Sequence, residues 1–337
     1  MLLKIKEKTA PERLISLRNA LDRHHVSHCV STTSEQTVIG LEKALSSDLL
    51  EEIERLGCVE ECLNVATPFK LASRAFKPAK TRICIQDVVI GGDQVILMAG
   101  PCAIESEEQL RSIANELKKA RVSVLRGSAF KPRTSPYSFQ GMGVEGLKLH
   151  QKMQKEHGLL IETEVMDVRD VAIVAEHVDI VRIGARNMQN FNLLKEVGGC
   201  GKPVILKRSM SATVEEWLMS AEYLMAHGNH QVILCERGIR TFENSTRSTL
   251  DLSSVAVARQ LTHLPIIVDP SHAAGRKDII PALSKAAVAL GADGLLIEVH
   301  NQPDLAKCDG KQALLPEELV QLSLELGQIA QAVGKWL

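Results

Sequence analysis

The sequence predicts an α/β protein, namely a (β/α)8 TIM barrel preceded by a small ferredoxin-like α+β domain. Two observations predict this arrangement. From about residue 95 onward, eight apolar runs are each followed by helix-compatible sequence, and this alternation is typical of a parallel sheet buried on both faces. The 337 residues also leave room for one barrel of about 250 residues and one small domain.

The first 67 residues predict the small domain. Strand and helix patterns follow in the order strand (2–6), helix (14–23), hairpin (26–41), helix (49–57) and strand (59–65), which is the ferredoxin-like order. The hairpin is expected to turn at Thr33 to Gln36, and the second helix to end at Gly57. Residues 68–80 carry several basic side chains without periodicity, so we expect a linker that lets the domain move.

The barrel is assigned to residues 81–337. It begins with a short hairpin predicted around Gly91 and Gly92. The eight strands that follow are predicted at 95–100, 122–127, 159–165, 180–185, 203–208, 231–237, 265–270 and 294–299.

Composition excludes several classes of function. There are 40 Lys and Arg against 41 Asp and Glu, and aromatic residues make up only 3%, so nucleic acid is not an expected partner. No apolar run approaches the roughly 18 residues that a membrane span needs, and the N-terminus alternates apolar with charged residues. The eight cysteines form no CxxC pair, which argues against a zinc cluster or a disulfide framework. We therefore expect a cytoplasmic protein.

Reactive side chains gather where the predicted strands end, and in a barrel these ends meet on the face that carries active sites. They are Cys102, Arg126, Lys131, Glu164, Arg186, Lys207, Arg208, Glu236, Arg237, Asp269, His272, Glu298 and His300. One cation could pair with a carboxylate of a neighbouring strand, but five or six at equivalent ends favour a multiply anionic substrate with phosphate and carboxylate groups.

Four residues together suggest a metal site. Cys102, His272, Glu298 and Asp309 offer one thiolate, one imidazole and two carboxylates, a mixed set that suits a borderline divalent ion. A histidine near a strand end is more often structural, so the residues alone leave both interpretations open.

Several long motifs resemble one known family. They are AGPCAIES (99–106), LRGSAFKPRTSPYSFQG (125–141), IGARNMQNF (183–191), LKRSMSAT (206–213), CERGIRTFE (235–243), VDPSHAAG (268–275), IEVH (297–300) and CDG (308–310). From about Phe69 to the C-terminus they resemble the 3-deoxy-D-arabino-heptulosonate 7-phosphate (DAHP) synthases, and the likeness is greatest to the type Iβ subgroup with an N-terminal ferredoxin-like regulatory domain. Over the N-terminal domain the resemblance rests on the order of elements.

The resemblance implies condensation of phosphoenolpyruvate with erythrose 4-phosphate to give DAHP and phosphate, the first step of the shikimate pathway. It implies a divalent metal (Mn, Fe, Co or Zn) on Cys102, His272, Glu298 and Asp309. The implied phosphoenolpyruvate ligands are Arg126, Lys131 and Lys207 at the carboxylate, Arg186 and Arg237 at the phosphate with Ala185 beside them, and Glu164 through water. Arg133 and Thr134 match the site of the sugar phosphate. The groups expected to act in catalysis are Lys131, Glu164, Cys102 and His272.

Two positions depart from the pattern of similar proteins, which often carry Asn and Ser where this chain has Ser248 and Cys308. The second thiol beside Asp309 is expected to affect metal preference or sensitivity to oxidation. Glu162 has the same strand parity as Glu164, so spacing does not separate the two residues. We choose Glu164 because it is nearer the mouth and fits the family pattern better.

Three other functions were weighed. A 3-deoxy-D-manno-octulosonate 8-phosphate synthase would use arabinose 5-phosphate and carries KANR-like sequence where this chain has KPRTS, so Pro132 argues against it. A non-catalytic sensor of a phosphorylated metabolite would have lost a metal ligand, and all four are present. An N-terminal chorismate mutase would be entirely helical, whereas residues 26–41 are strand-like.

The resemblance also implies partners. We expect an aromatic amino acid, tyrosine or phenylalanine, to act as a feedback effector on the N-terminal domain, and a homo-oligomer with a tetramer favoured. The polar hairpin at 27–37, with His28, Ser31 and Thr32, is the candidate effector contact. The alternative is an ordinary solvated hairpin.

Overall fold

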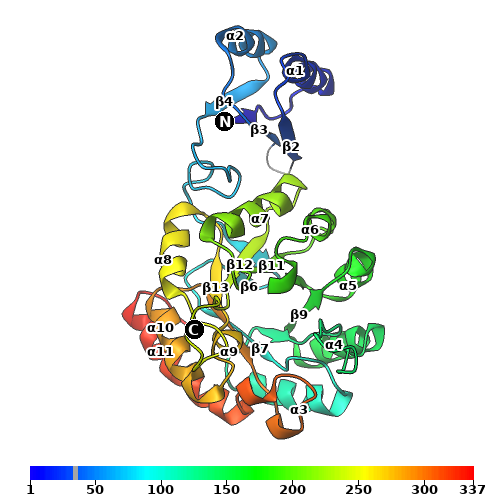
Figure 1. Cartoon of the computed structure of the whole chain (residues 1–337), viewed down its shortest axis with the longest axis vertical. Coiled ribbons are helices and arrows are strands. Elements are labelled where there is room, and N and C mark those ends of the chain that lie inside the picture. Colours follow the sequence, from blue (N-terminus) through cyan, green and yellow to red (C-terminus); the bar gives the residue numbers. More distant parts are fainter. Residues whose placement is uncertain (33–36) are drawn as a thin grey trace.

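The structure is a computed structural model that describes residues 1–32 and 37–337. A small N-terminal domain sits at one end of the molecule, and a closed barrel ringed by helices forms the other end (Figure 1). Both parts of the predicted fold are confirmed. In the part of the chain that the structure describes, no helix is both long and apolar enough to cross a membrane.

The N-terminal domain is an antiparallel four-stranded sheet in the order β2-β3-β1-β4. Its elements are β1 (Leu2–Ile5), α1 (Pro11–Arg23), β2 (His28–Thr32), β3 (Thr37–Leu41), α2 (Ser47–Leu56) and β4 (Val59–Leu63). Alternate strand residues such as Leu3 and Ile5 pack with Leu17 of α1 and Ile53 of α2. The helix α2 ends at Gly57, as predicted, and Gly57 adopts the left-handed conformation. The expected turn at Thr33 to Gln36 lies outside the described residues.

Residues 68–80, the expected linker, are anchored on the barrel. The partly buried Glu222 carboxylate accepts hydrogen bonds from the backbone N–H groups of Leu71 (2.8 Å) and Ala72 (2.9 Å). The ring of His263 lies 2.7 Å from the Leu71 carbonyl oxygen and 2.7 Å from the Thr81 hydroxyl, so it connects both ends of the segment. These contacts hold the segment that follows the small domain against the barrel.

Eight parallel strands close the barrel in the order β7 to β14. They are β7 (Ile96–Gly100), β8 (Val124–Arg126), β9 (Leu160–Val165), β10 (Ile180–Ile183), β11 (Val204–Lys207), β12 (Val232–Glu236), β13 (Ile266–Val268) and β14 (Gly294–Glu298). The surrounding helices are α3 (Glu107–Leu117), α4 (Val144–His157), α5 (Val171–His177), α6 (Phe191–Gly198), α7 (Val214–Ala226), α8 (Leu252–Leu261), α9 (Pro270–Ala274), α10 (Ile280–Ala289) and α11 (Pro316–Ala332).

Inside the barrel, side chains change from apolar to charged along most of the strands. The lower interior is one apolar cluster that includes Ile96, Leu160, Ile180 and Ile205. Side chains two or four residues further on point to the same side of a strand. At those positions the interior residues are Arg126, Glu162, Glu164, Arg182, Lys207, Asp269 and Glu298. This change concentrates charge at the carboxyl ends of the strands.

The barrel floor is closed by a hairpin of β5 (Ile83–Ile85) and β6 (Val88–Ile90), whose Ile83 and Ile90 join the lower apolar cluster. The prediction that this hairpin turns around Gly91 and Gly92 is wrong. The turn lies at Gln86 and Asp87, where Gln86 adopts a φ of 53°. Gly91 follows the second strand, where a Cβ atom would lie 2.4 Å from the Thr81 carbonyl oxygen.

Candidate active site

The first site residue, Cys102, follows the end of β7, where the chain passes very close to β8. Gly100 has a φ of 151°, and a Cβ atom there would lie 2.1 Å from the Arg126 carbonyl oxygen. Only glycine fits at this crossing. The close approach places Cys102, which is 4% exposed, above the barrel interior, where its sulfur accepts a hydrogen bond from Lys131 Nζ at 3.0 Å.

The structure brings the four expected metal ligands together. One donor atom each from Cys102, His272, Glu298 and Asp309 lies within 4.8 Å of the others. His272 Nε2 is 3.2 Å from Glu298 Oε1 and 3.9 Å from Asp309 Oδ2, and the Cys102 thiol is 3.2 Å from the same Asp309 oxygen. A sulfur, a nitrogen and two oxygens therefore converge from three different strand ends and one loop.

His272 is held in the form that a metal ligand needs. The backbone N–H of His272 donates a hydrogen bond to Asp269 Oδ1 at 2.9 Å, and the ring Nδ1 is 2.7 Å from Asp269 Oδ2. Burial lowers the pKa of His272 to about 4, so the ring is neutral at neutral pH. With Nδ1 facing a carboxylate, Nε2 keeps its lone pair toward Glu298 and Asp309, which is the usual carboxylate–histidine–metal arrangement. The donor set thus fits a divalent ion.

Arg126 lies fully buried beside this cluster. Its Nη1 donates to Glu298 Oε1 at 2.6 Å. Burial raises the pKa of Glu298, but the neighbouring cations, Arg126 among them, outweigh burial and lower it. The Nε and Nη2 of Arg126 have no hydrogen-bond partner among the described residues. Leaving buried guanidinium N–H groups without an acceptor costs free energy, so these two nitrogens mark a place where an acceptor atom of a ligand fits.

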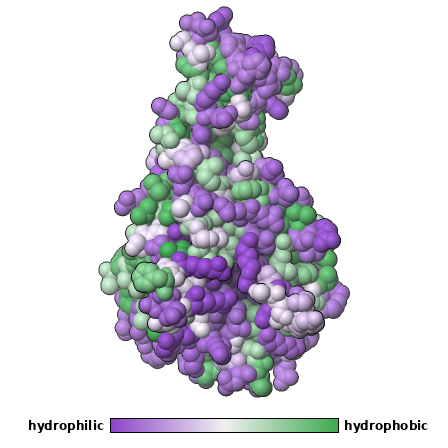
Figure 2. Space-filling model, in the orientation of Figure 1, coloured by the Kyte–Doolittle hydropathy of each residue, from purple (hydrophilic) through white to green (hydrophobic). Residues whose placement is uncertain are grey.

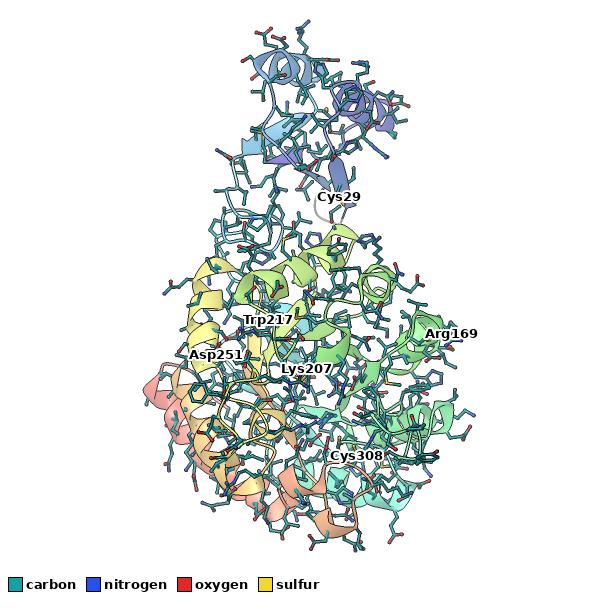
Figure 3. The ribbon with its side chains drawn as sticks, in the orientation of Figure 1. Cys29, Arg169, Lys207, Trp217, Asp251 and Cys308 are labelled. Atoms are coloured by element: carbon teal, nitrogen blue, oxygen red, sulfur yellow. The ribbon has the colours of Figure 1, made fainter. Side chains whose placement is uncertain are left out.

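A pocket of about 310 Å³ opens beside the cluster. Its charged and hydroxyl lining comes from Lys131, Arg133, Thr134, Ser135, Ser138, Glu164, Arg182, Arg186, Lys207, Arg237, Arg247, His272 and Asp309, and Ala185 also contributes. Hydrophilic residues gather over the centre of the barrel face (Figure 2), and Lys207 and Cys308 lie in that central region whereas Arg169 lies at the periphery (Figure 3). Seven cationic side chains around one small cavity favour an anionic ligand.

Lys131 and Glu164 are both buried in this pocket and both charged. Burial disfavours the ammonium of Lys131, but the neighbouring Cys102 raises its pKa. Burial likewise disfavours the Glu164 carboxylate, but Arg182, Lys131 and Lys207 lower its pKa. At neutral pH Glu164 is therefore a proton acceptor.

The expected substrate residues fall into two groups. The first group lines the pocket and consists of Lys131, Arg133, Thr134, Ala185, Arg186, Lys207 and Arg237, whereas Arg126 is fully buried and is not part of the lining. Glu164 also lines the pocket, whereas Glu162 is fully buried with its Oε1 2.7 Å from Arg182 Nε. Of the two glutamates, it is the one nearer the mouth that lines the pocket.

Three of the strand-end residues are not at the mouth. Arg208 and Glu236 point to the outer side of the sheet, where Arg208 Nη1 donates to Glu236 Oε2 at 3.0 Å and to Ser254 at 2.7 Å. His300 is buried against Gln109, with 3.0 Å between their side-chain nitrogens. The expectation that these three residues lie at the mouth was wrong. For Arg208 and Glu236 the reason is strand parity, because Lys207 and Cys235, one residue earlier, point into the barrel and side-chain direction reverses with each residue.

Sequence reasoning missed two cations of the pocket, Arg182 and Arg247. Arg182 lies in β10, two residues after Ile180 of the lower apolar cluster. Strand alternation therefore points both side chains into the barrel, and this alternation could have identified Arg182 from the sequence. Arg247 lies in the loop after β12, where no periodicity points to a location.

Both departures from the family pattern touch expected site residues. The Cys308 and Cys102 sulfurs are 3.2 Å apart, and Arg133 Nη1 donates to the Cys308 sulfur at 2.7 Å. Ser248 accepts a hydrogen bond from Arg237 at 3.2 Å. The second thiol is thus adjacent to the metal cluster and to the expected sugar-phosphate residue.

Known proteins resemble this chain over most of its length. The family model described as "DAHP synthetase I family" matches residues 70–335. The phospho-2-dehydro-3-deoxyheptonate aldolase of Thermotoga maritima is 44% identical over 334 residues, which is 99% of both chains. A 2-dehydro-3-deoxyphosphooctonate aldolase of Syntrophotalea carbinolica is 33% identical over 270 residues, covering 74% of this chain and 96% of that protein.

Solved structures give the same result. The crystal structure of the T. maritima enzyme, described as a DAHP synthase, superposes with a TM-score of 0.80 and covers 99% of this chain and 98% of that one. A truncated form of that enzyme covers 80% of this chain and 98% of its own, at 46% identity and a TM-score of 0.75. With a family match over most of its length and a full-length relative at 44% identity, the chain belongs to the DAHP synthetase I family.

Proposed function

We propose that the 310 Å³ pocket is where this chain condenses phosphoenolpyruvate with erythrose 4-phosphate to give DAHP and phosphate, the first step of the shikimate pathway. The observation that supports the location is the four-donor cluster beside a cavity with seven cationic side chains. Two phosphorylated substrates repel each other, and fixed guanidinium and ammonium groups offset that repulsion while they hold the reacting carbons close together.

Phosphoenolpyruvate is assigned to the deeper part of the pocket. The unpaired nitrogens of Arg126, with Lys131 and Lys207, offer donors to its carboxylate, and Arg186 and Arg237, beside Ala185, to its phosphate. Arg133 and Thr134, which lie in the loop after β8, are assigned to the phosphate of the sugar. This order leaves C3 of phosphoenolpyruvate facing the aldehyde near the metal cluster.

The family is metal-dependent, and when bound, a divalent ion supplies a Lewis acid for the aldehyde oxygen. Charge stabilisation and proton transfer are assigned to the side chains. Lys131 is placed between Cys102 and the pocket, where its ammonium stabilises negative charge on a substrate. C3 attacks the aldehyde carbon, which leaves an alkoxide on the aldehyde oxygen and positive charge at C2. Water adds at C2, and Glu164, which is ionised, accepts a proton from that water, which balances the proton that the alkoxide takes up. The C2 hydroxyl then loses its proton to become the ketone while the C2–O bond to phosphate breaks and phosphate leaves.

The metal is proposed to be Mn, Fe, Co or Zn on Cys102, His272, Glu298 and Asp309, because a thiolate in the set disfavours Mg. Exhaustive chelation should abolish turnover, and one of these ions, but not Mg, should restore it. Full activity of a Cys102→Ala variant with no bound metal would refute the assignment.

The sugar substrate can be tested directly against the nearest alternative. Consumption of phosphoenolpyruvate should be fast with erythrose 4-phosphate and negligible with arabinose 5-phosphate, because Pro132 departs from the octulosonate 8-phosphate synthase sequence. The 2-dehydro-3-deoxyphosphooctonate aldolase of S. carbinolica aligns with 74% of this chain, whereas the T. maritima relative aligns with 99%. A preference for arabinose 5-phosphate would overturn the proposal.

The N-terminal domain is proposed to bind tyrosine or phenylalanine and to inhibit the barrel, since all proposed catalytic residues lie outside this domain. Of the expected contacts, Ser31 is buried and donates to the Met225 carbonyl oxygen of α7 at 2.7 Å, so its hydroxyl joins the two domains. Thr32 instead lines a groove between the domains together with Lys4, Lys77 and other residues. Such a position lets one ligand touch both parts of the molecule.

Removal of the residues before Pro68 tests this role. The truncated protein should remain active and lose inhibition by the amino acid, because it keeps the anchored segment at 68–80. Inhibition that survives truncation would exclude the domain as the sensor. A homo-tetramer and a cytoplasmic location remain predictions, which light scattering and cell fractionation can test.

A further inference from the structure

We infer that Arg247 and Gln312 position the two carboxylate ligands of the proposed metal site, so that each presents a single oxygen to the ion. This inference rests on the proposed site and adds two residues to it. Arg247 lies in the loop after β12, and Gln312 in the loop after β14. Below they are called the Arg247–Gln312 pair.

At Asp309 the two carboxylate oxygens have different surroundings. Oδ2 faces the cluster, at 3.2 Å from the Cys102 sulfur and 3.9 Å from His272 Nε2. Oδ1 faces the other way and is 3.5 Å from Arg247 Nη1. The guanidinium therefore engages the oxygen that is not directed at the other ligands.

At Glu298 the same division occurs. Oε1 is directed into the site, 3.2 Å from His272 Nε2 and 2.6 Å from Arg126 Nη1. Oε2 accepts a hydrogen bond from Gln312 Nε2 at 2.5 Å. Gln312 is 3% exposed, so water does not compete freely for this contact.

The pair is itself connected, and its chemistry fixes the orientation of the amide. Arg247 Nη1 donates to Gln312 Oε1 at 3.1 Å. A carboxylate only accepts hydrogen bonds and a guanidinium only donates, so the Gln312 NH2 group must face Glu298 and its oxygen must face Arg247. The chain Arg247, Gln312, Glu298 has one consistent set of donors and acceptors, and Arg247 reaches Asp309 as well.

Such outer contacts matter because ligands that are held in place in advance lose less freedom when a metal binds. Loss of a hydrogen-bonding partner behind a metal ligand typically weakens metal binding about tenfold to a hundredfold. Arg247 also lines the pocket, so the competing interpretation is that it contacts only a substrate phosphate. The two interpretations differ in whether the metal affinity changes when no substrate is present.

The test measures Co²⁺ binding to metal-free, full-length protein without substrates, through the charge-transfer absorption of the cobalt–thiolate bond. The variants are Arg247→Gln, Arg247→Lys and Gln312→Leu. Arg276→Gln is the matched control, because Arg276 is an exposed arginine paired with Asp278 and has no place in the site. Thermal unfolding of the metal-free proteins reports whether each variant folds.

We expect the dissociation constant for Co²⁺ to rise about tenfold to a hundredfold in Arg247→Gln and Gln312→Leu, with partial rescue in Arg247→Lys and no change in Arg276→Gln. The double variant Arg247→Gln/Gln312→Leu should be less weakened than the product of the single effects, because both residues act on one connected network. If folded Arg247→Gln binds Co²⁺ as tightly as the unaltered protein, the inference is wrong. If the unaltered protein lacks the thiolate band, or Cys102→Ser keeps it, the proposed metal site itself fails.

Discussion

The substitution Gly184→Ala tests the role of Glu164 without changing that residue. Gly184 follows β10 and has an ordinary φ of −69°, so alanine fits the backbone without strain. Its Cβ atom, however, would lie 2.0 Å from Glu164 Oε1 and 2.9 Å from Glu164 Cδ. Normal contact distances are about 3.5 Å, so the carboxylate has to move by more than roughly 1 Å.

A displacement of this size removes Glu164 from the position where it can accept a proton from water. Misplacement of a reacting group by about 1 Å can lower a rate about a hundredfold, and we expect a similar loss in kcat/KM for phosphoenolpyruvate. The assay is the disappearance of phosphoenolpyruvate with erythrose 4-phosphate and saturating metal, with thermal unfolding as a check on the fold.

The matched control is Gly327→Ala in α11, where the added Cβ atom meets no described heavy atom within 4 Å. Alanine in a helix interior is favourable relative to glycine, so this variant should keep full activity and lose no stability. If Gly184→Ala is as active as Gly327→Ala, then Glu164 does not act where we place it.

Three further predictions concern the two substrate positions, the thiol pair and the pH dependence of stability. Arg133→Ala should raise the KM for erythrose 4-phosphate, and Arg186→Ala should raise the KM for phosphoenolpyruvate, each about tenfold to a hundredfold. If Arg133→Ala instead raised only the KM for phosphoenolpyruvate, the two phosphate positions would be assigned the wrong way round. In metal-free protein treated with peroxide, peptide mapping should find Cys102 linked to Cys308, whose sulfurs are 3.2 Å apart, and Cys308→Ser should slow the loss of the Cys102 thiol; equal loss rates would contradict this. Burial lowers the pKa of His263 from 6.5 to about 4, so between these pH values the unfolded chain binds a proton that the folded chain does not. The free energy of unfolding should therefore fall as pH drops through this window, by up to roughly 3 kcal/mol from this residue, and urea titrations should show a shallower fall in His263→Gln; an equally steep fall would argue against the assignment.

The architecture followed from the sequence because each barrel strand is an apolar run, and most of these runs end in charged residues. The same alternation explains the errors. Lys207 and Arg208 are adjacent at one strand end, but only Lys207 points into the barrel, and Arg208 pairs with Glu236 outside it. Strand-end residues therefore predict a site only after the inward-pointing residues have been separated from the outward-pointing ones by strand parity.

Irregular segments were less predictable. Residues 68–80 have no periodicity, so the sequence could not distinguish a free tether from the segment that Glu222 and His263 anchor. For Arg247 and Gln312 the difficulty is different. Their contacts join two loops that are 65 residues apart in the sequence, and no local pattern specifies such a meeting.

The arrangement of the four donors around one ion is tested most directly by crystals of the enzyme with Mn²⁺ and phosphoenolpyruvate. Anomalous diffraction should place one manganese ion among Cys102 Sγ, His272 Nε2, Glu298 Oε1 and Asp309 Oδ2, with phosphoenolpyruvate in the adjacent cationic pocket. A manganese ion bound elsewhere, in crystals of protein that is active with Mn²⁺, would contradict the account.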